Sequence, residues 1–248
     1  SISSTSICED GALTLTPTTG GTWISNDPSV ATVTPSGVVT IVTDGTVDFT
    51  FTEATNSCTA TTSNLTVNAT PAITMSTTDA CLNETVTLTP NSGGSWTSSN
   101  TSVATVTASG IVTLVSDGST NFTFTATNTC TATTATLTVN SLPNAIASNN
   151  GPICEGQALN LAGGAAGMTY SWSGPSGYTS TSQSPTVSAA ATTAMDGTYD
   201  LTVSDGTCTA TASTVVTVNG SPTIDVTGIV LNDPTSVSYT HLRAHETE

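Results

Sequence analysis

A long internal repeat limits the folds that this chain can adopt. Residues 21–45 read GTWISNDPSVATVTPSGVVTIVTDG, and residues 94–118 read GSWTSSNTSVATVTASGIVTLVSDG, an ungapped match identical at about two thirds of its positions. Copies spaced in this way indicate that one small folding unit occurs more than once. Such units bury only about 60% of their unfolded surface, so they often need covalent links besides a hydrophobic core.

Three similar strand endings divide the chain into predicted domains. Each ending has a Val-Asn pair followed by a proline three residues after the asparagine, which predicts a short, stiff connector. The endings are VNATP (67–71), VNSLP (139–143) and VNGSP (218–222). We therefore predict domains at residues 1–69, 70–141 and 142–220, followed at 221–248 by a strand-like segment that is either a donor strand or a truncated fourth repeat.

Polar and apolar residues alternate in a way that predicts β-strands throughout. Residues 29–35, 37–43 and 47–53 alternate apolar side chains largely with threonine, the period of a half-buried strand. Threonine suits the outward positions because it is β-branched and polar. Asp-Gly turns at Asp44 and Asp117 separate the strands. The predicted fold class is all-β, with three tandem β-sandwiches forming an extended rod.

The six cysteines fall into three pairs, one in each predicted domain. The members of a pair are 50, 49 or 54 positions apart, and no pair has the C-x-x-C spacing of a zinc or redox site. Such a pair forms either an intradomain disulfide or two reduced buried thiols. A disulfide closing a loop of this length contributes roughly 4 kcal/mol in the chain-entropy model and indicates an oxidising, extracellular setting. We predict the disulfides Cys8–Cys58, Cys81–Cys130 and Cys154–Cys208.

The charge balance excludes several classes of partner. The net charge is -16 because there is one Lys or Arg in all against 17 Asp and Glu. Nucleic acids and anionic membrane surfaces are bound through Lys and Arg, so neither is a predicted partner. No segment approaches the roughly 20 apolar residues of a membrane-spanning helix. Because the chain opens at Ser1 without a leader, we expect a mature or excised segment.

Each predicted domain contains one tryptophan, which lies between its two cysteines and closer to the first. Trp23, Trp96 and Trp172 are predicted core anchors, with a sugar-stacking platform as the alternative. The order Cys, Trp, Cys is similar to that of immunoglobulin domains, in which a tryptophan packs against a bridge between two sheets. Here the second cysteine follows a hairpin, so the predicted bridge reaches the last strand instead.

Two segments, SVATVTPSGVVTIVTDGTVDFTFT and SVATVTASGIVTLVSDGSTNFTFT, resemble the group 2 bacterial immunoglobulin-like repeats. This resemblance covers the first two predicted domains. In the third, GPICEGQALNLAGG, YSWSGPSGYTS and DGTYDLTVSDGTC resemble immunoglobulin-like or PKD-like modules of large secreted surface proteins of Bacteroidetes, and its Asp196-to-Tyr199 segment resembles a tyrosine corner. The resemblance implies three immunoglobulin-like sandwiches, secretion and an extracellular or cell-surface structural role.

The end of the chain has a different composition. SYTHLRAHET resembles a translated sequencing-adaptor sequence, and it holds both histidines and the only arginine. His241 and His245 have the spacing of two metal ligands on a helix, but no third ligand is evident. No predicted domain contains a histidine, so Ser-His or Cys-His nucleophilic catalysis has no base there. The chain is therefore predicted not to be an enzyme.

Polar residues of two kinds are candidates for calcium binding and for glycosylation. Acidic residues near the domain ends are candidate calcium ligands, with ordinary surface charge as the alternative; they are Glu9, Asp10, Asp79, Glu84 and Asp225. No other cofactor is predicted. Asn-x-Ser/Thr sequences make glycosylation a second candidate; they begin at Asn64, Asn68, Asn83, Asn100, Asn121 and Asn219.

Two functional hypotheses follow. The first is a non-enzymatic extracellular structural protein, forming a surface stalk or a self-assembling filament, whose partners are further copies or neighbouring immunoglobulin-like domains. In the filament form, residues 222–239 donate a strand to the open sheet edge of another copy. The second is a ligand-binding or carbohydrate-binding adhesin module, with Trp172 and Tyr178 beside the loop GPSGYTSTSQSP.

Overall fold

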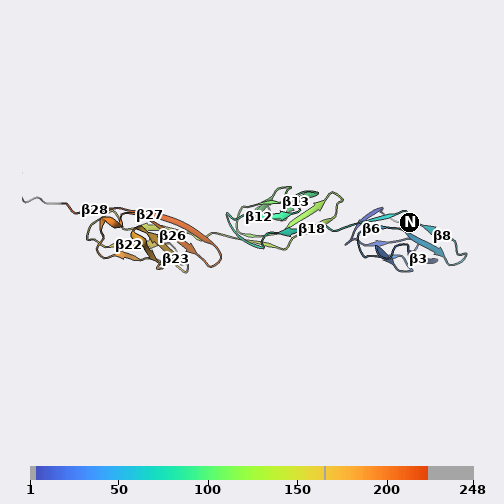
Figure 1. Cartoon of the computed structure of the whole chain (residues 1–248). Coiled ribbons are helices and arrows are strands. Elements are labelled where there is room, and N and C mark those ends of the chain that lie inside the picture. Colours follow the sequence, from blue (N-terminus) through green and yellow to red (C-terminus); the bar gives the residue numbers. More distant parts are fainter. Residues whose placement is uncertain (1–3, 165, 223–248) are drawn as a thin grey trace, which may run out of the picture. The chain divides into compact units, whose positions relative to one another are not determined.

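The computed structural model describes residues 4–164 and 166–222, and Figure 1 labels strands along this part of the chain. These residues divide into two compact units. Among the described residues, unit 1 comprises 4–145, 166–169 and 202–210, and unit 2 comprises 146–164, 170–201 and 211–222. The predictions made for the donor strand, for Asp225, for His241 and His245 and for the adaptor-like sequence concern residues outside the described part of the chain.

The all-β prediction is confirmed. In the described residues every regular element is a β-strand except two short 3-10 helices, η1 (Pro175–Gly177) and η2 (Thr193–Met195). Among these same residues no helix is long and apolar enough to cross a membrane. The high content of β-branched threonine and valine favours strands over helices.

The first part of unit 1, here called repeat 1, contains three small sheets. Their strand orders are β1-β9-β6, β2-β5-β4 and β3-β7-β8. The strands are β1 (Ser6–Cys8), β2 (Leu13–Thr14), β3 (Gly21–Ser25), β4 (Ala31–Val33), β5 (Val38–Ile41), β6 (Gly45–Val47), β7 (Phe49–Glu53), β8 (Thr59–Thr61) and β9 (Leu65–Asn68).

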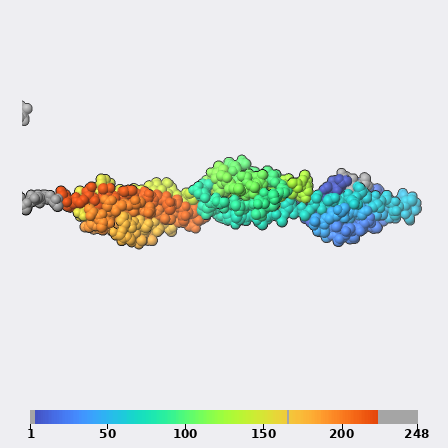
Figure 2. Space-filling model, turned by 45° about the horizontal axis from the view of Figure 1, so that its top comes forward, coloured from blue at the N-terminus to red at the C-terminus, as the bar shows by residue number. Residues whose placement is uncertain are grey.

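The next part of unit 1, repeat 2, has almost the same topology. Its sheets are β10-β12-β15-β14, β11-β19-β16 and β13-β17-β18. The strands are β10 (Thr74–Met75), β11 (Asp79–Cys81), β12 (Val86–Thr89), β13 (Gly94–Ser98), β14 (Ala104–Val106), β15 (Ile111–Leu114), β16 (Gly118–Thr120), β17 (Phe122–Ala126), β18 (Thr131–Thr133) and β19 (Leu137–Asn140). Figure 2 draws the atoms of repeat 1 in blue to cyan and most atoms of repeat 2 in green.

One long hairpin spans each of these repeats and crosses from one sheet to another. In repeat 1, β8 pairs antiparallel with β7, and β9 continues the same pairing along β6. Between the two pairings the Thr62 N–H donates to the Phe49 carbonyl over 2.9 Å. Repeat 2 forms the equivalent hairpin from β16–β17 and β18–β19. The tip and the open end of each hairpin therefore lie a full strand length apart.

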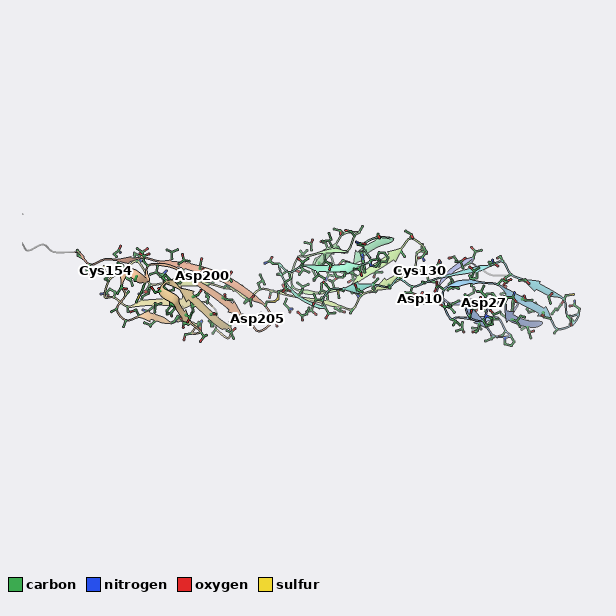
Figure 3. All side chains as sticks on the ribbon, in the orientation of Figure 1. Asp10, Asp27, Cys130, Cys154, Asp200 and Asp205 are labelled. Atoms are coloured by element: carbon green, nitrogen blue, oxygen red, sulfur yellow. A yellow bond between two sulfur atoms is a disulfide. The ribbon has the colours of Figure 1, made fainter. Side chains whose placement is uncertain are left out.

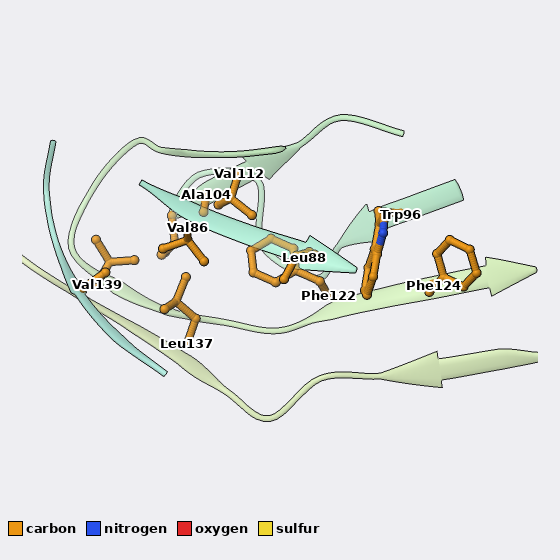
Figure 4. Packing of buried hydrophobic residues seen from close by; sticks show 11 residues of the cluster. Val86, Leu88, Trp96, Ala104, Val112, Phe122, Phe124, Leu137 and Val139 are labelled. Carbon is orange, nitrogen blue, oxygen red and sulfur yellow. The ribbon is translucent and has the colours of Figure 1, made fainter. Parts of the chain in front are cut away.

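The tryptophans anchor separate hydrophobic cores in the two repeats, as predicted. Trp23 and Trp96 are each 4% exposed. Their indole Nε1–H groups donate to the carbonyls of Pro17 and Pro90, at 2.7 and 2.8 Å. Figure 4 shows Trp96 packed beside Phe124, whose ring centroid is 5.1 Å away. The buried indole N–H is satisfied, so the whole side chain can contribute to the core.

The remaining strands, here called repeat 3, form sheets β20-β22-β25, β21-β28 and β24-β23-β26-β27. They are β20 (Ala147–Asn149), β21 (Ile153–Cys154), β22 (Leu159–Gly163), β23 (Thr169–Gly174), β24 (Tyr178–Ser180), β25 (Thr186–Ser188), β26 (Gly197–Ser204), β27 (Thr209–Val216) and β28 (Val218–Asn219).

Repeat 3 also has the predicted tyrosine corner. The Tyr199 side chain is fully buried, and its hydroxyl donates to the Met195 carbonyl over 3.1 Å. Burial raises the pKa of Tyr199 above its usual value. The predicted domain boundaries at 69, 141 and 220 follow β9, β19 and β28 and stay predictions, as does the extended rod.

Candidate functional site: the cysteine junctions

Three cysteines, the strand-end cysteines Cys8, Cys81 and Cys154, occupy one position in the fold. Each ends a strand that pairs in parallel with the Val-Asn strand of its own repeat, directly opposite the asparagine. The opposed residues are Cys8 and Asn68, Cys81 and Asn140, and Cys154 and Asn219. In all three, the N–H of the next residue donates to that asparagine's carbonyl, at 3.1, 3.0 and 2.9 Å. The backbone therefore presents these three side chains in the same way.

The other three, the hairpin-tip cysteines Cys58, Cys130 and Cys208, share a second position. Each immediately precedes the returning strand of its hairpin, β8, β18 or β27. The cysteine N–H donates to a side-chain oxygen in the tip, which fixes the turn. The acceptors are Asn56 Oδ1 at 2.9 Å, Asn128 Oδ1 at 3.1 Å and Asp205 Oδ1 at 2.8 Å.

The structure contains two disulfides, and each joins a strand-end cysteine to the hairpin-tip cysteine of the following repeat. Cys8 is bonded to Cys130 with Cα atoms 5.7 Å apart, and Cys81 is bonded to Cys208 with Cα atoms 5.8 Å apart. All four cysteines belong to unit 1, because residues 202–210 contact that unit. Figure 3 shows Cys130 near Asp10, two residues after its bonded partner.

The predicted intradomain pairs Cys8–Cys58, Cys81–Cys130 and Cys154–Cys208 are therefore wrong. In repeats 1 and 2 the hairpin-tip cysteine lies at one end of the long hairpin and the strand-end cysteine lies opposite the asparagine at its open end. About ten strand residues at 3.3 Å each separate these ends by about 30 Å. A disulfide requires Cα atoms within about 7 Å of each other.

Two cysteines have no partner in this structure, and both are exposed. They are Cys58, the hairpin-tip cysteine of repeat 1, and Cys154, the strand-end cysteine of repeat 3. The bonded equivalents of Cys58, which are Cys130 and Cys208, are each only 1% exposed, and Cys81, a bonded equivalent of Cys154, is 9% exposed. All six cysteines of the sequence lie in the described residues, so these two are the complete set of unpaired thiols there.

The acidic residues beside the strand-end cysteines bind backbone amides. Glu9 accepts from the N–H groups of Asp44 and Thr70 through its two carboxylate oxygens, both at 3.0 Å. Glu155 occupies the equivalent place after Cys154 and accepts from Thr193 at 3.2 Å and Ser221 at 3.4 Å. The hydrogen bond from Thr193, followed by that from Ser221, lowers the pKa of Glu155.

The predicted calcium ligands do not come together as a site in the described residues. Glu84 accepts from the Cys81 N–H at 2.8 Å, and Asp79 accepts from the Asn140 side-chain amide. No group of three metal-ligating side chains occurs in residues 4–164 and 166–222. Asp79 thus joins the parallel strands β11 and β19, and Glu84 fixes the turn that follows Cys81.

The two residues of the predicted ligand loop are placed differently. Trp172 is 1% exposed and donates its indole N–H to the Ser182 carbonyl over 3.1 Å, so it is a core anchor like the other tryptophans. Tyr178 is half-buried and lines a hollow of about 200 Å³ with residues that include Pro175 and Tyr199. Only Tyr178 of the pair is open to a ligand.

The candidate glycosylation sites differ in exposure. Asn68 is half-buried, and its side-chain nitrogen donates to the Ser6 hydroxyl at 2.7 Å, so this nitrogen is already used within the fold. Asn121 is also half-buried. The exposed sites are Asn64, Asn83, Asn100 and Asn219. Glycosylation of these residues stays a prediction.

Among protein families, the bacterial Ig-like domain (group 2) matches residues 64–139. The matched segment covers most of repeat 2 and is less than a third of the chain. No curated protein matches the chain. Immunoglobulin-like domains of this kind are typical of extracellular adhesion and surface proteins.

Several solved structures are similar over parts of the chain. One is a C-terminal 282-residue fragment of intimin in complex with the intimin-binding domain of the translocated intimin receptor. It has 18% sequence identity and a TM-score of 0.39, and the match covers 60% of this chain and 65% of that chain. The present chain thus spans about 65% of the length of the intimin fragment. Extracellular domains 3–5 of Drosophila OTK match with 11% identity over 86% of this chain and 93% of that chain, at a TM-score of 0.33. Domains 4 and 5 of the S-layer protein SbsC match with 26% identity over 53% of this chain and 82% of that chain, at a TM-score of 0.22.

Proposed function

We propose that this chain is a non-enzymatic extracellular structural protein that builds a surface stalk or a self-assembling filament from repeated immunoglobulin-like modules. The observation that carries this proposal is the pairing of the cysteines. Both disulfides join a strand-end cysteine to the hairpin tip of the next repeat, so covalent bonds connect the repeats in series.

This pairing suits a protein whose role is to extend a surface stalk or a filament. A disulfide inside one repeat stabilises that repeat alone, whereas a bond between repeats also restricts the angle at the connector. The bonded residues are 122 and 127 positions apart. In the chain-entropy model, closing a loop of that size stabilises the folded state by about 5 kcal/mol. Such bonds persist in oxidising, extracellular compartments.

The polar groups support a structural role over a catalytic one. Residues 1–222 contain no histidine. The carboxylates beside the cysteines, Glu9, Glu84 and Glu155, are engaged by backbone amides. Side chains held in this way act as acceptors that fix loops.

Electron microscopy of the oxidised chain tests the structural proposal. The matched variant carries Cys8→Ser and Cys81→Ser, which removes both bonds while leaving the hairpin tips intact. We expect elongated wild-type particles with narrow distributions of the angles between repeats, and broad distributions in the variant. Circular dichroism of the variant must show that its strands are retained. Equal angle distributions in the two proteins would contradict the proposal.

Strand donation by residues 222–239 is a further form of the filament hypothesis. An unpaired sheet edge is a template for an incoming strand, which supports the idea in general terms. Deletion of residues 221–248 tests it, because the deletion should leave folded monomers. Fibres of the shortened chain would contradict strand donation but not the structural role of the repeats.

The second candidate function is a ligand-binding or carbohydrate-binding adhesin module. It is favoured by the half-buried ring of Tyr178 at the hollow in repeat 3. A glycan array with the wild type, Tyr178→Ala and the neighbouring control Thr179→Ala tests it. The adhesin hypothesis requires saturable binding that only Tyr178→Ala abolishes, and it fails if the wild type binds nothing or if both variants bind equally.

A further inference from the structure

The two unpaired cysteines are one of each kind. Cys154 is a strand-end cysteine and Cys58 is a hairpin-tip cysteine, and these two kinds form both disulfides of the chain. We propose that Cys154 of one copy forms a disulfide with Cys58 of a second copy, joining copies head to tail. This inference rests on the filament form of the proposed function. It adds that the partner is a second copy of this chain and that the bond is a disulfide.

Cys154 has the local structure of the strand-end cysteines that are bonded. It lies opposite Asn219 in a parallel pair, as Cys81 lies opposite Asn140. The Glu155 N–H donates to the Asn219 carbonyl at 2.9 Å, and the Leu82 N–H donates to the Asn140 carbonyl at 3.0 Å. Figure 3 places Cys154 near the end of the described chain. Its thiol is therefore presented as the bonded thiols are, but it is exposed.

Cys58 has the local structure of Cys130. Both residues follow a residue in the left-handed conformation, Ser57 with φ 57° and Thr129 with φ 70°. Both donate their N–H to an asparagine side chain two residues earlier, at 2.9 and 3.1 Å. Both carbonyls accept a hydrogen bond of 2.9 Å from the end of the preceding strand. Repeat 1 thus offers the same hairpin tip that repeat 2 uses to bind Cys8.

The bond requires an oxidant, which we take to be a low-molecular-weight disulfide such as oxidised glutathione. The Cys58 thiolate attacks this disulfide and forms a mixed disulfide, releasing one molecule of the small thiol. The Cys154 thiolate of the second copy then attacks the Cys58 sulfur and releases the second small thiol. The two protein thiols are oxidised to one disulfide, the small disulfide is reduced to two thiols, and the two protons pass to solvent or to the leaving thiolates.

The geometry of the bond determines the kind of assembly. It uses two different surfaces, one on repeat 3 and one on repeat 1, so it is a heterologous contact. Such contacts form open chains, or rings where the rotation closes. Each copy can bond one further copy through Cys58 and another through Cys154. The bond between copies then has the same pattern as the bonds between repeats, in which a strand-end cysteine joins the hairpin-tip cysteine of the next repeat.

Two single variants, Cys58→Ser and Cys154→Ser, test the proposal when they are oxidised separately and as an equimolar mixture. The oxidant is oxidised glutathione, and the products are separated on non-reducing gels. The first variant retains only the strand-end thiol and the second only the hairpin-tip thiol. Random coupling in the mixture would make about half of all dimers mixed, whereas selective head-to-tail bonding makes nearly all of them mixed. The wild type should form a ladder of oligomers that collapses on reduction.

Mass spectrometry identifies the bond in the mixed dimer. Trypsin is unsuitable because the chain contains a single Lys or Arg, so a protease that cuts after aromatic or acidic residues is used. The expected product is one peptide pair containing Cys58 and Cys154. Monomers in the oxidised mixture, or a mixed dimer that makes up only about half of all dimers, as random coupling gives, would overturn the proposal. Neither result would affect the structural proposal, which the angle distributions test.

Discussion

Cys58 and Cys130 occupy the same position in two repeats of almost the same topology, yet only Cys130 is bonded. The turn, the asparagine acceptor and the strand that follows are shared, and the difference is the presence of Cys8 beside Cys130. The local sequence therefore presents the thiol, and the neighbouring repeat determines whether it is oxidised. Cys58 therefore has the local structure of a bonded cysteine but stays free, because no strand-end cysteine of another repeat is bonded to it in this structure.

The largest expected effect comes from removing the bond that distinguishes these residues. The double variant Cys8→Ser, Cys130→Ser opens a loop whose ends are 122 positions apart, and we expect the free energy of unfolding of repeats 1 and 2 to fall by about 5 kcal/mol. The control Cys58→Ser should change it by less than about 0.5 kcal/mol, because an exposed, unpaired thiol contributes little. Denaturant unfolding followed by tryptophan fluorescence measures both. Equal effects would contradict the comparison.

Tryptophan replacement tests whether the two repeats are otherwise equivalent. Trp23 and Trp96 have the same exposed fraction, and each packs against a phenylalanine, with ring centroids 5.0 and 5.1 Å apart. Trp23→Ala and Trp96→Ala should each cost about 4 kcal/mol of folding stability, since both leave a large cavity. Chemical denaturation with circular dichroism gives the two values. A difference between them well beyond the error of the fits would show that the cores are not interchangeable.

A smaller effect is expected at the asparagines that hold the hairpin tips. Asn128→Ala leaves the N–H of a buried residue, Cys130, without its acceptor, and we expect a loss of about 1 kcal/mol. Asn56→Ala removes the same hydrogen bond at the exposed Cys58, where water can replace the lost acceptor. Its effect on the unfolding midpoint should be clearly smaller. The comparison fails if Asn56→Ala destabilises the chain more than Asn128→Ala.

The smallest effect is a pH dependence confined to the third hairpin tip. There Asp205 replaces the asparagine, and hydrogen bonds from the backbone N–H groups of Cys208 and Thr207 lower its pKa. Because the pKa in the folded state is lower, the stabilisation is complete above the unfolded value of about 4. It is lost as the pH falls through the lowered folded-state pKa.

Hydrogen exchange corrected for its intrinsic pH dependence measures this effect. The amide protons of Thr207 and Cys208 should lose protection in acid, whereas those of Cys58 and Cys130 should not, because asparagine does not titrate. Asp205→Asn should remove the difference. Unchanged protection of Cys208 below the folded-state pKa of Asp205 would show that the carboxylate charge does not hold this turn.

Much of the local structure could be predicted from the sequence. Alternating threonine and apolar residues predicted the strands, and the spacing of Trp23 and Trp96 predicted two equivalent core anchors. The segment ending at Tyr199 predicted the tyrosine corner. Each of these features depends on neighbours within one repeat, so local patterns were sufficient.

The cysteine pairing could not be predicted from the same patterns. The regular spacing of the cysteines fits a bond within a repeat and a bond between adjacent repeats equally well, because every repeat carries both kinds of cysteine. The deciding fact is the parallel pairing of β1 with β9, which places Cys8 opposite Asn68. That pairing brings together the first and last strands of repeat 1, and such a long-range pairing produces no periodic pattern in the sequence. The sequence indicates the hairpin before Cys58, but it carries no sign that the hairpin separates this cysteine from Asn68 by a full strand length.

The overlap of the two disulfide loops changes how this chain would respond to tension. The loop closed by Cys8 and Cys130 overlaps the loop closed by Cys81 and Cys208. Force applied beyond Cys8 and Cys208 passes through both bonds and along only the 49 positions from Cys130 back to Cys81. That path can extend by about 170 Å, compared with about 700 Å for the unlinked backbone. Between the two bonds, the shortest path therefore runs through repeat 2 alone, in the reverse direction of the chain, and the backbone of the two loops outside residues 81–130 stays slack.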